Sequence, residues 1–365
     1  MKRVKQGLTI ATVSLVLLFA LEGGVRLLAP QHVDARLLAG HPLAVEDTVL
    51  GHRNRAGAVV QQRGPEFTAL YTINEHGFRD RAVDADERPP GRLRVVLLGD
   101  SFTFGIGSDY EEIWPTVFEH ALQTGGYPVD VINAGVPGYD TRSEVLYLEH
   151  DWDALRPDVV VFTFMPNDLF TNTPVHAPDS TKEQQAVIVP MGEKAPVLHV
   201  LTLLQRWLLR HDGLYTWMYR RTARGPFFED PPARHIQRQL ETTAALLRRA
   251  QAFCRMRGVP FVVFSIPQQF QVLVEANGYV AGNVDVHTVD RVLSREAAET
   301  GFTYVAALDT LAAAYRRTDT DLYYRLDGHL TEPGNRLAGL HFAGRFEDVL
   351  TRQMDRDGTS PVEEN

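Results

Sequence analysis

Five short apolar runs organise the chain, each rich in Val, Ile or Phe and each too short for a typical helix. Runs that are apolar almost throughout are typical of strands covered on both faces, as in a parallel sheet between two helix layers. The expected strands are residues 93–98, 129–133, 158–164, 259–266 and 302–305.

Segments with helical spacing of apolar residues alternate with these strands. The expected helices are residues 111–123, 142–155, 233–257, 286–299 and 334–350. This alternation predicts an α/β fold with a mostly parallel, doubly wound sheet. A chain of 365 residues can bury the core of one large α/β domain and still carry extra segments.

Composition argues against two classes of function. The net charge is −9 and there is no long basic run, which argues against a nucleic-acid surface. The single cysteine, Cys254, allows no intramolecular disulfide and belongs to no Cys/His group of the kind that binds zinc. Cys254 lies in an apolar helical pattern, so we expect an inert core residue.

Residues 1–30 have the pattern of a targeting segment. Three basic residues within positions 2–5 precede an uncharged run over residues 7–21. That run is shorter than the ~20 residues of a membrane span, but residues 23–28 extend it far enough. A cleaved signal peptide is the competing interpretation, and the missing Ala-x-Ala site favours an uncleaved anchor. Either way, the basic cluster predicts a periplasmic or extracellular location for the rest of the chain.

Residues 31–91 form a polar lead-in with short apolar runs and many turn residues, which predicts a small β-rich or irregular segment. Within it, the sequence Asn-Glu-His-Gly-Phe-Arg at 74–79 predicts at least a turn in which Gly77 takes a positive φ. Residues 84–91 end in Pro-Pro-Gly and resemble a linker to the main domain at 92–352.

Residues 169–232 are an insertion, and 197–219 within it have the pattern of an amphipathic helix, with Gly213 as a break. We favour a helix packed in the core, since Leu-rich stripes usually pack there. This interpretation predicts that Leu204→Asp collapses the fold, because it buries an unpaired charge. The alternative is a lid or a membrane-facing element beside the site. The polar tail, residues 353–365, is expected to be disordered.

Distinctive residues follow the first three expected strands and precede the last helix. They are Gly99-Asp100-Ser101, residues 133–140 with two glycines, Asn167-Asp168, and Asp327-Gly328-His329. The carboxyl ends of parallel strands meet at one edge of an open α/β sheet, where such sheets place their sites. We therefore expect these residues to lie close together.

These residue types match the needs of acyl transfer. A serine hydroxyl becomes a nucleophile when a histidine takes its proton, and a carboxylate orients that histidine. A glycine amide and an asparagine side chain can stabilise the oxyanion. Taken singly, Asp100 or Ser101 is equally a helix cap, and Gly138 or Asn167 an ordinary turn residue. All four elements in this order are difficult to explain by chance.

The ordered set resembles the SGNH hydrolase superfamily, also called GDSL-type esterases, over residues 92–350. The resemblance implies a flavodoxin-like, five-stranded sheet and a Ser101 nucleophile, with His329 as base and Asp327 as its orienting carboxylate. Residues 74–79 resemble the Asn-x-x-Gly-Phe-Arg lead-in of membrane-anchored bacterial members.

The same resemblance implies an oxyanion hole made by the Ser101 and Gly138 amides and the Asn167 side chain. It implies no metal or organic cofactor. Only Gly328 separates Asp327 from His329, where the family often has two residues. The shorter spacing resembles branches that act on polysaccharide acetyl groups, including acetyltransferase-like members.

The expected function is a membrane-anchored serine esterase that hydrolyses acyl esters, short-chain or acetyl, of carbohydrate or lipid substrates. The first alternative is an O-acyltransferase of cell-envelope or exported polysaccharide. The second is a non-catalytic carbohydrate-binding or assembly protein, because fold and motif do not guarantee turnover. The expected partners are an acylated glycan or lipid and the membrane, without nucleic acid.

Overall fold

The computed structural model describes residues 2–31, 36–39, 42–80, 91–172, 198–278 and 282–357. Its centre is a five-stranded sheet in which every neighbouring pair is parallel. The strands are β6 (Leu93–Leu98), β7 (Val129–Asn133), β8 (Val159–Phe164), β9 (Phe261–Ser265) and β10 (Thr303–Ala306). Each lies within two residues of its expected bounds, and the predicted α/β fold is confirmed.

The strand order is β10-β9-β8-β6-β7, the flavodoxin-like order. The first strand of the sheet, β6, therefore lies between β7 and β8, and the chain winds away from it in opposite directions. In doubly wound sheets, ligands bind outside the carboxyl ends of the strands at this reversal. Ser101 follows the carboxyl end of β6 and lies at this position.

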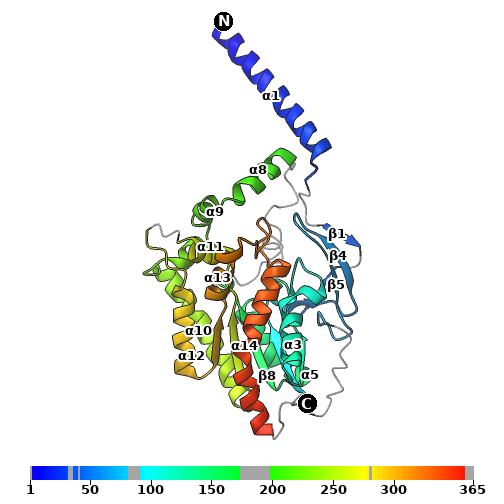
Figure 1. The fold of residues 1–365 in the computed structure, drawn as a ribbon, viewed down its shortest axis with the longest axis vertical. Helices are drawn as coiled ribbons and strands as arrows, with labels where there is room; N and C mark the ends of the chain where they lie inside the picture. Colours follow the sequence, from blue (N-terminus) through cyan, green and yellow to red (C-terminus); the bar gives the residue numbers. More distant parts are fainter. Residues whose placement is uncertain are drawn as a thin grey trace.

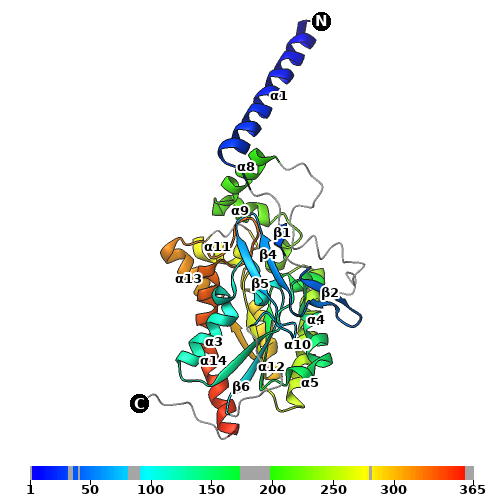
Figure 2. The same ribbon diagram turned by 90° about the vertical axis from the view of Figure 1, so that its right-hand side faces the viewer.

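Two layers of helices cover the sheet (Figures 1 and 2). On one face, α3 (Trp114–Thr124) packs against α14 (Glu332–Asp357). On the other, α10 (Arg234–Arg255) contacts α4 (Thr141–His150) and α12 (Thr288–Thr300). Pro115 lies in the first turn of α3, where a missing N–H costs no hydrogen bond. A 3₁₀ turn, η1 (Tyr110–Glu112), precedes it, so the helix begins later than expected.

The sequence pattern did not predict several short helices. Two of them, α11 (Gln269–Asn277) and α13 (Leu308–Thr318), pack together where β9 and β10 end. The segment 142–155 divides at Asp151 into α4 and α5 (Trp152–Leu155). The others are α2 (Ser101–Phe104), α6 (Asp168–Thr171) and the 3₁₀ helix η3 (Gly225–Phe228).

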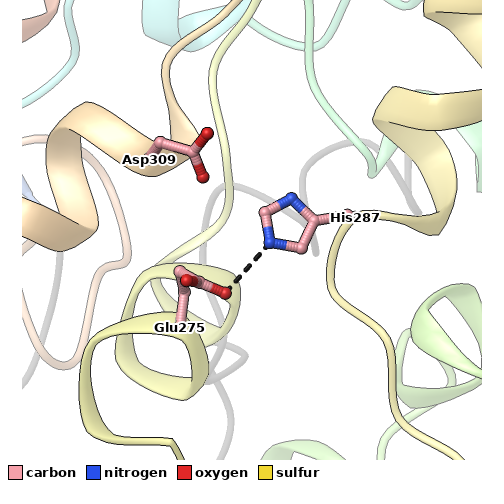
Figure 3. Close-up of side chains that lie close together, drawn as sticks. All are labelled: Glu275, His287 and Asp309. Carbon is pink, nitrogen blue, oxygen red and sulfur yellow. Dashed lines mark hydrogen bonds and ion pairs between the residues drawn. The ribbon is translucent and has the colours of Figure 1, made fainter.

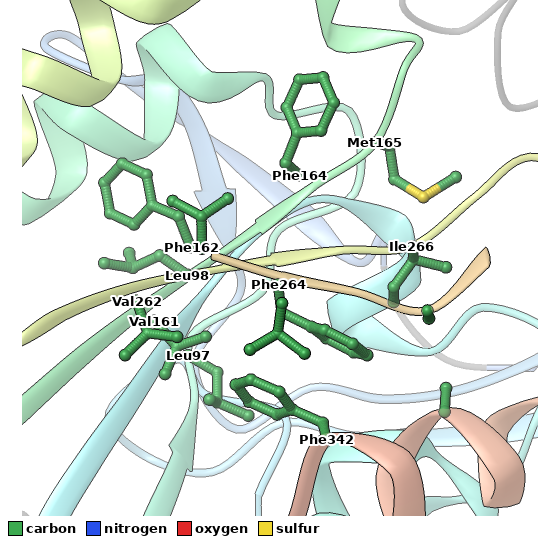
Figure 4. Close-up of a cluster of buried hydrophobic side chains, with 14 of the residues drawn as sticks. Leu97, Leu98, Val161, Phe162, Phe164, Met165, Val262, Phe264, Ile266 and Phe342 are labelled. Atoms are coloured by element: carbon green, nitrogen blue, oxygen red, sulfur yellow. The ribbon is translucent and has the colours of Figure 1, made fainter. Parts of the chain in front are cut away.

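The core lies between the sheet and the two helix layers, and Figure 4 shows its centre. Phe342 of α14 stacks on Phe264 of β9, with ring centroids 4.2 Å apart. Phe162 of β8 points to the other face of the sheet and is also fully buried. Each such side chain contributes about 1.5–3 kcal/mol through removal of its apolar surface from water. This rigid core holds the ends of the strands in fixed positions.

The lead-in is β-rich, as expected. Its strands are β1 (Arg36–Ala39), β2 (Ala44–Asp47), β3 (Gly51–Asn54), β4 (Val59–Arg63) and β5 (Thr68–Thr72). They form a three-stranded antiparallel sheet, β1-β4-β5, and a two-stranded sheet, β2-β3. A small apolar cluster joins the lead-in residues Val60 and Tyr71 to Phe104 and Ile106, which come shortly after Ser101. Most of the expected linker lies outside the described residues.

The N-terminal segment is one long helix, α1 (Lys2–Leu28), which projects from the domain in Figures 1 and 2. Among the described residues, it is the one helix long and apolar enough to cross a membrane, over Thr9–Leu28. A signal sequence meets the same criterion, so length and composition do not separate the two interpretations.

The Leu-rich part of the insertion forms two helices, α8 (His199–Leu209) and α9 (Asp212–Tyr219). The prediction that this segment packs in the core is wrong for α8, whereas Tyr215 and Tyr219 of α9 do pack against the core. Leu201, Leu204 and Trp207 are 55, 48 and 58% exposed. The reason is that α8 packs beside α1 and α9, away from the sheet. Helical spacing alone does not say what faces the apolar stripe.

The C-terminal helix is longer than expected. It continues to Asp357, so the disordered tail assigned to residues 353–365 begins too early. Gln353 and Met354 are buried, and their packing keeps the last turns helical despite the polar sequence. Residues 358–365 lie outside the described part of the chain.

Candidate active site

The turn that connects β6 to α2, Gly99-Asp100, leads to the expected nucleophile Ser101 and is here named the nucleophile turn. The Asp100 carboxylate caps α2 and accepts a hydrogen bond from the Phe102 amide at 2.8 Å. Asp100 thus takes the capping role, and Ser101 begins the helix with its side chain free for another partner. Gly99 is required by space, because a Cβ there would lie 2.0 Å from Oγ1 of Thr103. Each residue of the Gly-Asp-Ser sequence thus has its own structural reason: Gly99 fits the space, Asp100 caps α2, and Ser101 begins the helix.

His329 lies between Ser101 and Asp327. Its Nε2 is 2.8 Å from the Ser101 Oγ, and its Nδ1 is 2.5 Å from the Asp327 Oδ1. Gly328 has φ +89°, a left-handed conformation that favours glycine, and this allows the carboxylate and the imidazole to meet across a single intervening residue. The short Asp-Gly-His spacing is thus compatible with a direct contact.

The imidazole of His329 is largely buried. Burial lowers the pKa of His329, but the charge and hydrogen bond of Asp327 raise it, and the net shift is upward. A histidine held in this way takes a proton more readily than one in water. The Phe102 ring packs against the imidazole, with centroids 4.8 Å apart, and limits its rotation.

The two expected oxyanion donors lie on neighbouring loops. The loop after β7 is tied to the nucleophile turn by a 2.9 Å bond from the Val136 amide to the Gly99 carbonyl. Gly138 is two residues further along, at φ +87°. The Asn167 side chain donates to the Asp100 carboxylate at 3.5 Å. The structure thus brings Asn167 beside the nucleophile turn and places Gly138 on an adjoining loop.

Sequence reasoning missed Glu66, a lead-in residue that binds the loop carrying Asp327. Its carboxylate accepts three backbone hydrogen bonds, from Arg325 at 3.1 Å, Leu326 at 2.7 Å and Asp327 at 3.1 Å. Burial raises the pKa of Glu66, while the Leu326 and Asp327 amides act in the opposite direction. The chain has 46 acidic residues, and no local pattern distinguishes this one.

Arg79 binds the end of α2 and the segment that follows it. Its buried guanidinium donates to the carbonyls of Phe104, Gly105 and Ser108 at 2.5–2.6 Å. It also lies over the rings of Tyr71 and Phe104. The motif at 74–79 was the sequence signal for this residue, although its role was not predicted.

The lead-in also binds the loop after β7. The Asn54 side chain donates to the Gly135 carbonyl at 2.9 Å, and the His52 Nε2 lies 2.9 Å from the Pro137 carbonyl oxygen. The Tyr139 hydroxyl donates to the His52 carbonyl in return. One small β-rich segment therefore contacts the segment after α2, the loop after β7 and the loop that leads to Asp327 and His329.

A group of buried acids lies behind the nucleophile turn. Burial raises the pKa of Asp100, and it raises those of Glu144 and Asp168 further, with added repulsion among the carboxylates. Neither carboxyl oxygen of Glu144 has a hydrogen-bond partner. Asp168 accepts a bond from the Thr141 hydroxyl at 2.9 Å. Such groups are held in their neutral, protonated form over a wider pH range than in water.

One group outside this site has metal-ligand chemistry. Glu275, His287 and Asp309 converge from three helical segments (Figure 3), and their ligand atoms lie within 4.8 Å of one another. His287 already bonds Glu275 at 3.0 Å. His287 and Asp309 also line a surface cavity of about 620 Å³. Asp309 follows β10, three strand positions from β6, so this group is separate from Ser101.

Known proteins that are similar to this chain include the following esterases. An arylesterase of Vibrio mimicus is 32% identical over 75 residues, which span 20% of this chain and 38% of that protein. The acetyl xylan esterase AlAXEase is 14% identical, with 69% of this chain and 99% of that one covered at a TM-score of 0.43. A catalytic mutant of an acetylxylan esterase from Geobacillus stearothermophilus is 15% identical, with 75% and 97% covered at a TM-score of 0.41.

The family model for the GDSL-like Lipase/Acylhydrolase family matches residues 97–337. The match begins in β6, before Ser101, and ends in α14, after His329. It therefore contains every loop described above as part of the site and more than half of the chain. The chain belongs to the GDSL-like Lipase/Acylhydrolase family and is a hydrolase that acts on ester bonds.

Proposed function

We propose that the protein is a serine esterase in which Ser101, His329 and Asp327 act as a catalytic triad. The observation that carries this proposal is the continuous chain of contacts from Asp327 through His329 to the Ser101 hydroxyl. The Ser101 Oγ attacks the ester carbonyl while His329 Nε2 takes its proton. His329 then returns that proton to the leaving alcohol, and a water molecule, activated in the same way, releases the acyl group.

The oxyanion of each tetrahedral intermediate is stabilised by the Ser101 and Gly138 amides and the Asn167 side chain. The position of Ser101 at the start of α2 supports this role, because the amides of a first helical turn have no partner within the helix. The contact of Asn167 with Asp100 supports it as well, since it keeps the amide group next to the nucleophile.

The proposed substrates are short acyl esters, acetyl above all, of a glycan or a lipid. The arylesterase relative makes aryl acetates suitable first probes. The single residue between Asp327 and His329 resembles the spacing in family branches that act on polysaccharide acetyl groups, and this resemblance keeps acyl transfer to a sugar hydroxyl as the second candidate. We further propose that α1 anchors the protein, with its catalytic domain outside the cytoplasm.

The test is a panel of aryl esters and acetylated glycans, assayed with and without acceptor sugars. Ser101→Ala should abolish turnover, His329→Ala should do nearly as much damage, and both should keep the parental melting temperature. Asn167→Ala should reduce kcat by about 10²–10³-fold, the loss expected for one oxyanion donor. Acylated sugar as the main product would favour the transferase. Unchanged turnover in Ser101→Ala would refute the triad.

A further inference from the structure

Helices α8 and α9 carry an exposed apolar surface. Among the described residues outside α1, twelve large apolar side chains are exposed, and six of them lie on these two helices. They are Leu201, Leu203, Leu204, Trp207, Trp217 and Met218, here named the α8–α9 apolar face. Monomeric soluble proteins rarely expose contiguous apolar patches of this kind without a partner.

The two sides of α8 are unlike. Leu201, Leu204 and Trp207 recur at intervals of three residues and share the exposed side. Thr202 and Leu209 lie on the opposite side and are buried. The most apolar side of the helix therefore faces away from the protein, the reverse of a helix packed on a core.

Basic residues border this face. Arg210, Arg220 and Arg221 are exposed at the ends of α8 and α9. The Arg221 guanidinium lies over the Trp217 ring, 3.7 Å from its centroid. Leucine and tryptophan on one side with arginine at the rim are typical of helices that lie in the interface of an anionic bilayer.

Direct contacts hold α8 at one level along α1. The Glu22 carboxylate accepts hydrogen bonds from the first amides of α8, His199 and Val200, at 3.0 Å each. Glu22 is the first charged residue after the uncharged run of α1. The Gln31 amide also donates to the His199 ring at 2.9 Å. Glu22 lies six residues before the end of the candidate span Thr9–Leu28, and α8 therefore begins close to the outer end of that span, near the membrane–water interface.

Helix α9 connects this interface to the site. The Asp212 carboxylate bonds the Arg325 guanidinium and the Tyr315 hydroxyl, each at 2.8 Å. Arg325 lies two residues before Asp327 in the loop that carries the catalytic pair. Figures 1 and 2 both show α8 and α9 between α1 and the domain.

We propose that the α8–α9 apolar face inserts into the surface of the anionic bilayer that α1 spans, and that it turns the catalytic edge of the sheet towards that bilayer. The proposal rests on the anchoring part of the proposed function. It implies that the acyl ester reaches Ser101 from the membrane surface, as part of a membrane-borne molecule.

The chain's own tryptophans report the insertion. Full-length protein is reconstituted in phosphatidylglycerol vesicles, with or without lipids brominated on the acyl chains near the headgroup. Of the four tryptophans, Trp114 is buried and Trp152 lies in α5, at the end of the domain opposite α1. Bromolipids should quench the parent, and the double variant Trp207→Phe/Trp217→Phe should lose this quenching. Equal quenching in both proteins, or none in the parent, would overturn the proposal.

A charge placed on the face provides a second measurement. Leu204→Asp should keep the parental melting temperature, reduce quenching, and slow hydrolysis of a vesicle-embedded ester several-fold while leaving a water-soluble aryl ester unaffected. The matched control is Met256→Asp, because Met256 is 77% exposed at the far end of α10. A melting temperature that falls sharply in Leu204→Asp alone would place Leu204 in a packed interface and overturn the proposal.

Two further outcomes are distinguishable. A second copy of the chain covering the face would produce a dimer that Leu204→Asp dissociates, together with unquenched tryptophans, and would overturn the proposal. Quenching does not depend on turnover. Normal quenching in a parent that hydrolyses no ester would therefore refute the esterase proposal and support the membrane contact.

Discussion

At the scale of single residues, the site depends on a histidine whose two nitrogens have different partners. One side of the His329 ring faces the Ser101 hydroxyl and the other faces the Asp327 carboxylate. The partner on Nδ1 determines which nitrogen can accept the serine proton. Asp327 therefore influences both the tautomer of His329 and the pH at which it becomes neutral.

The pH dependence of turnover tests this role. The base must be neutral, so activity rises with pH through the pKa of His329, which lies above the ordinary value of about 6.5. Asp327→Asn removes the charge that raises this pKa. We expect the acid limb of kcat/KM to move to lower pH, with a plateau reduced by about 10²–10⁴-fold. An acid limb that stays in place would show that another group titrates there.

The raised pKa of the buried acid Glu144 can be tested by measuring how the free energy of unfolding depends on pH. Its pKa in the folded protein lies well above the ordinary value of about 4.3, so the folded state holds a proton that the unfolded state releases. The free energy of unfolding should therefore be fully retained at low pH and fall as pH rises above about 4.3. Glu144→Gln cannot titrate, and its denaturation curves at about pH 5 and pH 8 should differ less than those of the parent.

The matched control for this measurement is Glu111→Gln, an exchange at an exposed position. We expect it to leave the parental pH dependence unchanged. If Glu144→Gln loses stability with pH as steeply as the parent, the dependence comes from Asp168 or Asp100, and Glu144 has no part in it.

At the scale of elements, the lead-in acts as a frame for the catalytic loops. Its strands β3 to β5 and the turns beside them supply Asn54, Glu66 and Arg79, and each binds backbone groups of a different loop. Backbone contacts of this kind position a loop whatever its side chains are. The geometry of the site therefore depends on a segment outside the α/β domain.

Glu66 is a positioning residue, and Glu66→Gln tests the frame. The variant keeps the volume of the side chain but replaces one accepting oxygen by an amide that opposes the backbone N–H groups. We expect kcat to fall by roughly 10- to 100-fold, because small displacements of reacting groups are costly. KM and the melting temperature should change little. Glu75→Gln is the control, since its side chain is 66% exposed. A loss of stability equal to the loss of rate would assign Glu66 a structural role only.

At the scale of the whole molecule, the N-terminal helix and the candidate site lie at one end. Helix α1 projects from the side where α9 packs against α11, and α11 follows the carboxyl end of β9. The Glu22 contacts with α8 are possible only if α1 remains attached to the chain. These contacts support the proposal that α1 is an uncleaved anchor.

Fractionation checks the anchor. Full-length protein should remain with membranes after a carbonate wash, because a spanning helix of 20 apolar-rich residues is not released by high pH. A reporter fused after Asn365 should be active only outside the cytoplasm, as the basic residues before α1 predict. A soluble protein with a new N-terminus would demonstrate cleavage, and a cytoplasmic reporter signal would reverse the orientation.

The strands and the order of the site residues followed from the sequence because both are local. A strand covered on two faces must be apolar along its length, as residues 93–98 are. The turn after it must satisfy its own amides and admit close packing, which requires the Gly-Asp-Ser sequence within a few residues. Parallel strands then bring their carboxyl ends to one edge, so the sequence alone predicted that Ser101 and Asn167 lie near each other. His329 lies in the loop before α14, and its place beside Ser101 was implied by the ordered set of motifs.

Only the tertiary structure determined which other part of the chain, or which solvent, each element contacts. Glu66 meets Leu326 across 260 residues of chain, and no local pattern records such a contact. The same Leu-rich stripe on α8 is compatible with a protein core or a bilayer, since both are apolar and impose the same helical spacing. In the folded chain, α8 packs beside α1 and α9, and its Leu-rich stripe remains exposed. Local sequence determines which surfaces must avoid water, and only the assembled chain determines what covers them.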